Sequence, residues 1–522
     1  RSISLDELVR DPVEQVERMA EAEGAMGLPH PAIPLPCDLY GTARRNARGL
    51  DLADENRLAR LAEVLRATIA PPWSAGPLLA VEGDAGKSEA GEQIGEQGSE
   101  SGSGEPQAVR NPAGAEDVVG YVSEATPAQV ELALEYAARG AAAWAAVPPA
   151  DRLEGDMQRL IGLLIREAGK TAANAVSEVR EAVDFLRYYA AEVSERFDNR
   201  THQPLGPVAC ISPWNFPLAI FTGQVAAALA AGNTVLAKPA EQTPLVAAEA
   251  VRALWAAGVP RSAAQLLPGR GETVGAQLVG DARVQGVMFT GSTEVARLLQ
   301  RTLAARVDVH GRAVTLVAET GGLNAMIVDS SALAEQVVVD ALRSAFDSAG
   351  QRCSALRVLC VQEDVADRVL EMLLGAMAEL RVGGPERLAI DVGPVIDAEA
   401  KSHLVQHIET MRAAGRRVHS LCAPGALPHD GHFVLPTLIE LSDLAELDRE
   451  VFGPVLHFVR YRREALDDLI EAIHRAGYGL TMGLHTRIDE TIAHVRERSR
   501  VGNLYVNRDM IGAVVGVQPF GG

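Results

Sequence analysis

The sequence predicts an α/β protein in which a parallel sheet is covered by helices on both faces. From Pro207 onward, short strand-like runs alternate with apolar helical segments, which is the pattern of repeated βαβ units. The chain has 522 residues, of which 47% are hydrophobic and 23% charged, as is ordinary for a soluble globular protein. This length allows roughly two to four domains.

Charge and cysteine content argue against several classes of protein. The formal net charge of −20 is unlike that of a nucleic-acid-binding surface. The five cysteines show neither CxxC nor Cys/His ligand spacing, so we expect no disulfide framework, no metal site and a reducing, cytoplasmic environment. No apolar run is long enough for a transmembrane helix, and Arg1 opens the chain without a start methionine or leader pattern. We therefore expect a piece of a longer chain.

The chain before residue 111 is predicted to contain an N-terminal helical linker region, residues 1–80, and then a flexible excursion, residues 81–110. Helices are expected over Ser4–Ala25 and Leu52–Ile69, with a proline-rich turn between them. Most of the excursion is rich in Gly, Ser and Glu and has no aromatic residue, so it has little apolar surface to bury.

Residues 111–318 are predicted to form one α/β domain, completed by part of 485–522, and residues 319–484 to form a second. Thr126 and Pro127 are typical of a helix start, as cap and first-turn residue. The strands and helices expected across both domains are 118–122, 155–197 with a break near 169, 208–212, 221–231, 234–237, 244–257, 265–268, 272–279, 286–290, 294–306, 314–317, 333–346, 357–362, 466–476 and 489–500.

A carboxylate and a thiol stand at the ends of neighbouring predicted loops. Glu319 ends a strand-like run and is followed by two glycines, and Cys353 lies in the loop after the helix at 333–346. The arrangement suits a cysteine nucleophile served by a glutamate general base. The alternative is a buried structural cysteine and an ordinary turn glutamate, which is the commoner fate of a lone cysteine.

Six motifs favour the first interpretation, because together they resemble the aldehyde dehydrogenase superfamily over about residues 107–522. They are Pro213-Trp214-Asn215-Phe216-Pro217, Lys238-Pro239-Ala240-Glu241-Gln242-Thr243-Pro244, Phe289-Thr290-Gly291-Ser292, Glu319-Thr320-Gly321-Gly322, Gly350-Gln351-Arg352-Cys353 and Glu450-Val451-Phe452-Gly453-Pro454. The resemblance implies the aldehyde dehydrogenase fold: a Rossmann-like NAD-binding domain at 111–318 and an α/β catalytic domain with the nucleophilic cysteine at 319–484.

Longer segments resemble the dehydrogenase half of the bacterial proline utilization A family. They are Arg352-Cys353-Ser354-Ala355-Leu356-Arg357, residues 325–333, residues 511–522 and residues 33–41. That family oxidises proline in two steps on one polypeptide, so the resemblance implies NAD-dependent oxidation of L-glutamate γ-semialdehyde to L-glutamate. It also implies a covalently linked proline dehydrogenase module, a homo-oligomer, and a cytoplasmic location with membrane association only through that module.

The resemblance assigns catalytic roles to three residues. Cys353 is the nucleophile and forms a thiohemiacetal and then a thioester, with Arg352 beside it to favour the thiolate. Glu319 is the general base for the water that releases the thioester. Asn215 donates its side-chain amide to the oxyanion; its alternative is a plain turn residue between two prolines.

The cofactor residues lie mainly at predicted strand ends. Lys238 and Glu241 follow the strand at 234–237, at the sheet edge where doubly wound sheets bind their ligands. A carboxylate there would repel a 2′-phosphate and favour NAD over NADP. Gly291 and Ser292 open a helix, where bare backbone N–H groups suit a pyrophosphate. The full set implied by the resemblance is Ile211, Ser212, Pro213, Trp214, Lys238, Glu241, Gly271, Gly291, Ser292, Glu450 and Phe452.

For the substrate, the resemblance implies a carboxylate anchor and two aromatic walls. Ser354, Gly512 and Ala513 match the anchor, whose hydroxyl and backbone N–H groups suit an anion. Phe216 and Phe520 match the walls, and Glu178 is a candidate partner for the ammonium group. Two alternatives stay open: a dehydrogenase for another ω-semialdehyde such as succinate semialdehyde, and a catalytically silent scaffold beside a proline dehydrogenase.

Overall fold

The computed structural model describes residues 9–24, 33–67, 72–80, 105–140, 154–198, 200–308, 310–421 and 430–521. The start of the predicted helix at Ser4, nearly all of the predicted excursion and Cys422 lie outside these residues. The chain divides into two compact units, Arg1–Arg48 and Gly49–Gly522.

In its described residues, 9–24 and 33–48, the first unit forms the helix α2 (Pro12–Glu23) and a short 3-10 turn at Pro36–Asp38. The carboxylate of Asp11 accepts from the backbone N–H of Val13 at 2.8 Å and so caps the helix start. Gly24 ends the helix in the left-handed region, at φ 75°.

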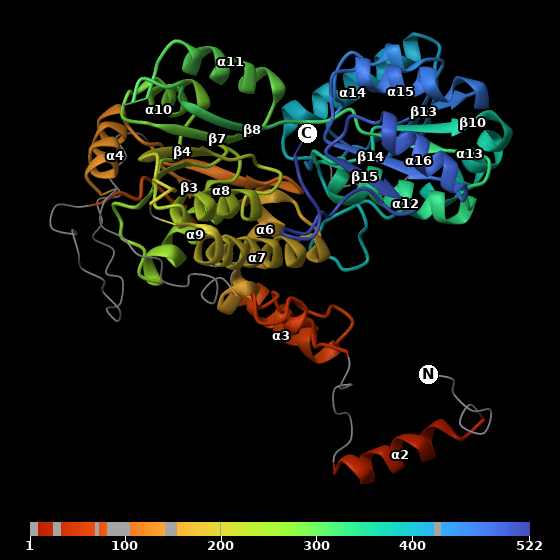
Figure 1. Ribbon diagram of the computed structural model, residues 1–522, viewed down its shortest axis with the longest axis horizontal. Coiled ribbons are helices and arrows are strands. Elements are labelled where there is room, and N and C mark those ends of the chain that lie inside the picture. The colour runs from red at the N-terminus through yellow and green to blue at the C-terminus, as the bar shows by residue number, and fades with distance from the viewer. Residues whose placement is uncertain are drawn as a thin grey trace. The chain divides into compact units, whose positions relative to one another are not determined.

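The second unit has two lobes, each built on a largely parallel sheet (Figure 1). The first lobe carries a five-stranded parallel sheet in the order β6-β5-β4-β7-β8. Its strands are β4 (Pro207–Ile211), β5 (Thr234–Lys238), β6 (Ala264–Leu266), β7 (Gly286–Thr290) and β8 (Thr315–Glu319). The strand order reverses between β4 and β7, and open α/β sheets bind ligands at the carboxyl ends of the strands at such a point.

Helices cover both faces of this sheet, as the alternating sequence predicts. Figure 1 shows α4, α10 and α11 over one face and α8 and α9 over the other, with α6 and α7 outside them. Their bounds are α4 (Pro127–Gly140), α6 (Met157–Ala168), α7 (Ala172–Arg196), α8 (Ala219–Ala230), α9 (Pro244–Ala256), α10 (Ala276–Gly280) after a π-turn at Gly271–Gly275, and α11 (Thr293–Ala304). The predicted break near Gly169 is confirmed, since Gly169 ends α6 at φ 64°.

Buried glutamates fix the two helices that follow the central strands. The carboxylate of Glu167 accepts from the N–H groups of Leu245 (2.6 Å) and Val246 (2.8 Å), which begin α9. Glu178 likewise accepts from the N–H of Leu218 at 2.8 Å, at the start of α8. These carboxylates satisfy N–H groups that a helix start leaves unpaired, and they suit the positive end of the helix dipole.

The second lobe carries a seven-stranded sheet in the order β11-β12-β13-β10-β9-β14-β15, in which only the β11–β12 pair is antiparallel. Its strands are β9 (Ala325–Val328), β10 (Val358–Gln362), β11 (Arg417–Ser420), β12 (Thr437–Leu441), β13 (Val455–Tyr461), β14 (Thr481–His485) and β15 (Asn503–Val506). Its helices are α12 (Ala334–Phe346), α13 (Glu363–Met377), α14 (Ala398–Ala413), α15 (Leu466–Arg475) and α16 (Asp489–Arg498). The central strands β9 and β10 are buried along their whole length, so they fix the lobe and the loops at their ends.

Two predicted domain boundaries need correction. Residues 49–80 are not part of a separate linker: α3 (Glu55–Ala67) packs on α6, and β1 (Trp73–Ala75) pairs in parallel with β3 (Gly114–Val122). With β2 (Gln107–Asn111), these strands form a third sheet. The strand at 503–506 does not complete the five-stranded sheet, because it pairs with β14 in the other lobe. Hydrophobic patterning does not encode which sheet a short strand joins.

Candidate active site

The loop that carries Cys353 is held in an unusual backbone conformation. Ser348, Ala349 and Gly350 follow one another in the left-handed region, at φ 57°, 54° and 66°. This conformation is costly for residues with a side chain, so the surrounding contacts must hold it. A Cβ on Gly350 would lie 2.2 Å from the carbonyl oxygen of Gly453, so this position accepts only glycine.

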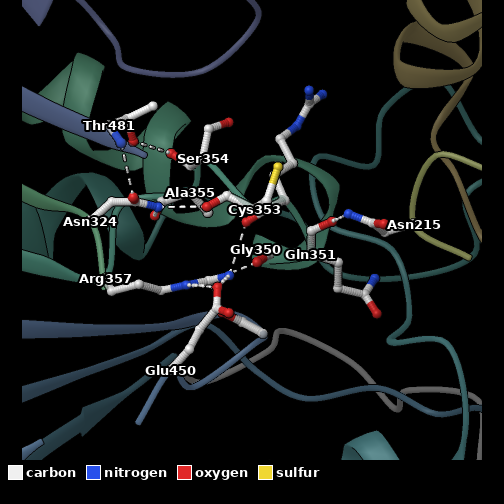
Figure 2. Close-up of polar contacts among 12 residues, drawn as sticks. Asn215, Asn324, Gly350, Gln351, Cys353, Ser354, Ala355, Arg357, Glu450 and Thr481 are labelled. Atoms are coloured by element: carbon white, nitrogen blue, oxygen red, sulfur yellow. Dashed lines mark hydrogen bonds and ion pairs between the residues drawn. The ribbon is translucent and has the colours of Figure 1, made fainter. Parts of the chain in front are cut away.

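A fully buried arginine, Arg357, holds the loop from within (Figure 2). Its guanidinium donates to the carbonyl oxygens of Gly350 (2.6 Å) and Arg352 (3.0 Å), which lie on the N-terminal side of Cys353. It also forms an ion pair with Glu450, with 2.9 Å between Nη2 and Oε1. One cation therefore binds both the nucleophile loop and the Glu450 segment.

Asn324 fixes the other side of the loop. Its Nδ2 donates to the carbonyl oxygens of Cys353 (2.6 Å) and Ala355 (2.9 Å), and its Oδ1 accepts from the N–H of Thr481 (3.3 Å), as Figure 2 shows. The backbone at Cys353 is thus held on both sides. Sequence reasoning missed Arg357 and Asn324 as part of the site; Arg357 stands in a quoted motif, but the motif alone gives no role for it.

Cys353 is half-buried as a residue, and the surroundings of its thiol favour the neutral form. Burial raises the pKa of the thiol to about 12, and the nearby Glu450 carboxylate acts in the same direction. The N–H of Ser354 and the cations of Arg357 and Arg352 lower this pKa. The predicted help from Arg352 is therefore present, but burial outweighs it.

Asn215 reaches the nucleophile loop from the other lobe. Its Nδ2 donates to the carbonyl oxygen of Gln351 at 3.1 Å (Figure 2). A side-chain amide has two N–H groups, so one remains for another acceptor beside Cys353. The predicted oxyanion donor and the predicted nucleophile are thus brought together.

Phe216 lies between two cations. The Nζ of Lys170 is 4.2 Å from the ring centroid and the guanidinium carbon of Arg352 is 5.1 Å from it. Lys170 also pairs with Glu178 at 2.7 Å, and both side chains are buried. Because Glu178 binds Lys170 and caps α8, its carboxylate is already occupied, and the interpretation of Glu178 as an ammonium partner is not supported.

Glu319 ends β8 at the level of Thr290, its register partner on β7. Its side chain points toward Gly521, where an added Cβ would lie 3.1 Å from Oε1. Burial raises the pKa of this carboxyl above its ordinary value. Two residues further on, Gly321 lies against the Glu450 carboxylate, which brings the Glu319 segment next to the partner of Arg357.

The predicted cofactor residues gather at the carboxyl ends of β4, β5 and β7. The carboxylate of Glu241 accepts from Nζ of Lys238 (3.0 Å) and from the N–H of Gly271 (2.7 Å). The hydroxyl of Ser292 caps α11 by accepting from Val295 N–H at 3.3 Å. The N–H of Ser212 donates to the carbonyl of Lys238 at 3.2 Å, and the neighbouring Ile211 and Pro213 follow the same strand end.

Two features make this strand edge fit a dinucleotide. A Cβ on Gly291 would lie 2.5 Å from the Phe289 ring, so the backbone there stays bare. Gln224 spans the reversal point, donating to Thr290 Oγ1 (3.0 Å), while its buried Oε1 has no hydrogen-bond partner. Unpaired buried acceptors of this kind are rare in proteins and suit a bound group.

Trp214 and Phe452 meet across the lobes, with ring centroids 5.6 Å apart in an edge-to-face arrangement. The Phe452 ring also lies 5.0 Å from the guanidinium carbon of Arg357. Two predicted cofactor residues, Trp214 and Phe452, thus contact each other next to Arg357, which holds the loop of Cys353.

The predicted substrate residues differ in how deeply they are buried. Ser354 is buried directly after Cys353, whereas Gly512 is exposed in the left-handed region, at φ 75°. Ala513 is half-buried, and Phe520 is 48% exposed. Ser354 and Phe216 therefore lie at the site, and the structure gives Phe520 no enclosed position.

Across the described part of the chain, no group of three His, Cys, Asp or Glu side chains is arranged to hold a metal ion. No helix among these residues is both long and apolar enough to cross a membrane. The four cysteines that are described are free thiols.

With this fold and this site, the chain belongs to the aldehyde dehydrogenase family, whose model matches residues 99–522. It is 62% identical to the bifunctional protein PutA of Escherichia coli (strain K12) over 535 aligned residues, covering all of this chain and 39% of that protein. It is 34% identical to a 1-pyrroline-5-carboxylate dehydrogenase of Bacillus licheniformis, covering 79% of this chain and 84% of that one. The chain thus spans about two fifths of the length of the PutA proteins that it matches.

Comparison with solved structures finds similar chains of the same two kinds. A crystal structure of a bifunctional proline utilization A protein matches with a TM-score of 0.80 and 44% identity, covering 100% of this chain and 49% of that one. The 1-pyrroline-5-carboxylate dehydrogenase from Thermus with bound NAD matches with a TM-score of 0.80 and 31% identity, covering 94% of each chain. The predicted family and fold are confirmed.

Proposed function

We propose that this chain oxidises L-glutamate γ-semialdehyde to L-glutamate with NAD, as the second step of proline breakdown. The observation that carries the proposal is the held position of Cys353, with the Asn215 amide bonded to Gln351 beside it and Arg357 and Asn324 bonded to its loop. The similarity to 1-pyrroline-5-carboxylate dehydrogenases supports the choice of substrate.

In the first step the Cys353 thiol loses its proton to solvent, and the resulting thiolate attacks the aldehyde carbon. The carbonyl π electrons move to oxygen, and the second Asn215 N–H and the Cys353 N–H stabilise the resulting oxyanion. Because the loop and the amide are fixed beforehand, these donors need little reorganisation as the charge develops.

NAD supplies the hydride acceptor, so that the thiohemiacetal becomes a thioester. In this proposal Lys238 and Glu241 would hold the adenosine ribose, and the bare backbone at Gly291 and Ser292 would hold the pyrophosphate. Trp214 and Phe452 border the nicotinamide side.

The thioester is then hydrolysed. Glu319 takes a proton from water, the water oxygen adds to the acyl carbon, and the Cys353 sulfur leaves as thiolate while the carboxylic acid is released. The raised pKa of Glu319 suits a base, since it brings the carboxyl nearer to neutral pH.

The substrate carboxylate is bound, in this proposal, by the Ser354 hydroxyl and the backbone N–H groups of Gly512 and Ala513, with Phe216 and Phe520 along the aliphatic chain. In the full protein we propose a covalently linked proline dehydrogenase module, since the PutA relatives are much longer than this chain, and a homo-oligomeric assembly.

The proposal is tested by following NADH formation in the full-length chain with the semialdehyde, succinate semialdehyde and butanal. A site built to bond a carboxylate loses these hydrogen bonds when the anion is absent, and hydrogen bonds to a charged group contribute about 1.5–3 kcal/mol each. Butanal should therefore be poorer in kcat/KM by at least roughly 100-fold for two lost bonds.

Ser354→Ala should lower kcat/KM for the semialdehyde and leave butanal almost unchanged, and Cys353→Ala should give no NADH with any aldehyde. An equal loss for both aldehydes in Ser354→Ala would mean that Ser354 supports Cys353 instead of binding the carboxylate. Faster turnover of succinate semialdehyde would favour the alternative substrate, and absence of turnover with all three would favour the scaffold.

A further inference from the structure

The carboxylate of Glu450 is engaged by two separate parts of the site. On one side, Arg357 donates to Oε1 through Nε (3.3 Å) and Nη2 (2.9 Å). On the other side, the backbone of Gly321 lies against Oε2 of the same carboxylate. Glu450 therefore stands between the nucleophile loop and the segment that begins at Glu319.

The Gly321 backbone and the Arg357 guanidinium both lie close to the Glu450 carboxylate. A Cβ on Gly321 would lie 1.7 Å from Oε2 of Glu450, so only glycine lets the two backbones and the carboxylate come together. The side chain of Glu450 is 14% exposed and that of Arg357 is fully buried. A buried pair of this kind is held in a fixed geometry only when its remaining hydrogen-bonding groups are satisfied, and Arg357 uses its other N–H groups on the carbonyls of Gly350 and Arg352.

We propose that the Arg357–Glu450 pair, held between the Cys353 loop and the Glu319–Gly322 segment, sets the charge around the Cys353 thiol before any cofactor binds. Arg357 and Glu450 then act on the thiol as two opposite charges in a fixed geometry, and Glu450 has this role in addition to the ribose contact expected for it. The proposal deepens the proposed function and rests on Cys353 as nucleophile and Glu319 as base.

The charges of the pair act on the thiol with opposite signs. Glu450 raises the pKa of Cys353, and Arg357 lowers it. Removing one partner should therefore change the thiol reactivity in one direction, and removing the other should change it in the opposite direction. A loss of packing alone would loosen the loop in both variants and move the reactivity the same way.

The experiment measures alkylation of Cys353 by iodoacetamide in the full-length chain, without cofactor, from pH 7 to pH 10. The modified Cys353 peptide is quantified by mass spectrometry, so the other cysteines do not interfere. Arg357→Met should slow alkylation at a given pH by about tenfold, as expected for a rise of one pKa unit. Glu450→Gln should accelerate it by a similar factor, and the double variant should fall between the two.

Arg357→Lys keeps the charge but cannot bond both loop carbonyls and Glu450 at once. We expect its alkylation pH profile to stay within about twofold of the parent protein, so it tests the charge effect even if Arg357→Met does not fold. The matched control is Arg368→Met. It removes an exposed arginine of α13 that pairs with Glu335 at 3.2 Å, and it should leave the alkylation pH profile of Cys353 unchanged.

The outcomes separate the two proposals. Unchanged alkylation in Glu450→Gln without cofactor would overturn the charge effect of the pair, because Glu450 would then act only through the cofactor. A change of the same sign in Arg357→Met and Glu450→Gln would also overturn it, because the pair would then only hold the loop in place. If the opposite signs appear but the parent protein oxidises no aldehyde, the charge effect stands and the proposed function fails.

Discussion

The Nδ2 atom of Asn215 lies 3.1 Å from the carbonyl oxygen of Gln351 and joins the two lobes two residues before the nucleophile. Asn215 follows β4 of the five-stranded sheet, and Gln351 precedes Cys353 in the other lobe. The predicted oxyanion donor is thus bonded to the loop of the predicted nucleophile, and because the two belong to different lobes, a shift of one lobe against the other would break this hydrogen bond.

Alkylation of Cys353 in the cofactor-free chain should rise about tenfold per pH unit from pH 8 to pH 10 and reach no plateau. The reason is that burial raises the pKa of the folded thiol to about 12, from an ordinary value of 9.0. The neutral thiol is favoured in the fold, so its contribution to stability is full below about pH 9 and is lost as the pH rises toward 12. The same peptide in denaturant should show a midpoint of its alkylation rate near pH 9, and a midpoint near pH 8 in the folded chain would contradict the raised pKa.

Glu319→Gln should slow release of the acyl group more than hydride transfer, because the amide cannot accept a proton from water. Rapid mixing with the semialdehyde and NAD should show a burst of NADH that persists, followed by a steady state reduced by about 100-fold or more. If the burst itself disappears, Glu319 acts before the thioester forms.

Glu241→Ser should narrow the preference for NAD over NADP. In the parent chain the carboxylate stands beside Lys238 at the end of β5, so a 2′-phosphate should cost roughly 1–3 kcal/mol in binding. Isothermal titration with both cofactors measures the gap. The control is Glu272→Ser, which removes an exposed carboxylate in the turn Gly271–Gly275. Equal binding of both cofactors by the parent chain would contradict the assignment of Glu241 to the cofactor site.

Gly350→Ala should destabilise the fold by at least about 2 kcal/mol, since alanine resists the left-handed region and its Cβ would clash with the Gly453 carbonyl. The free energy of unfolding in urea measures this loss. Gly375→Ala is the control, because an added Cβ meets open space in the last turn of α13, and it should gain up to about 1 kcal/mol. Similar values for the two variants would mean that the loop relaxes freely.

Local patterns predicted much of the fold, and the reasons for the failures are physical. The helix at 333–346 and the strands at 286–290 and 357–362 were predicted to within one residue, because buried βαβ units carry strong periodicity. The partners of short strands were not predictable: β1 and β15 are three and four residues long, and pairing depends on tertiary contacts that such runs do not encode.

The site residues likewise divide into those that the sequence could predict and those that it could not. Cys353, Glu319 and Asn215 stand in motifs that identify them, and the structure brings Asn215 to the loop of Cys353. Arg357 could not be assigned from the sequence, since a fully buried arginine at the start of a strand has no pattern of its own. Its role depends on carbonyl oxygens that come from two distant segments.

The parallel pairing of β1 with β3 sets a limit on how this protein can be shortened. A chain trimmed to begin at residue 111 would match much of the family model, yet it would remove both neighbours of β3, because β2 and β1 flank that strand. The freed N–H and C=O groups on both edges would be templates for pairing between molecules. Trimming that keeps residue 49 onward retains both neighbours, so Gly49 is the safer place to begin a shortened enzyme.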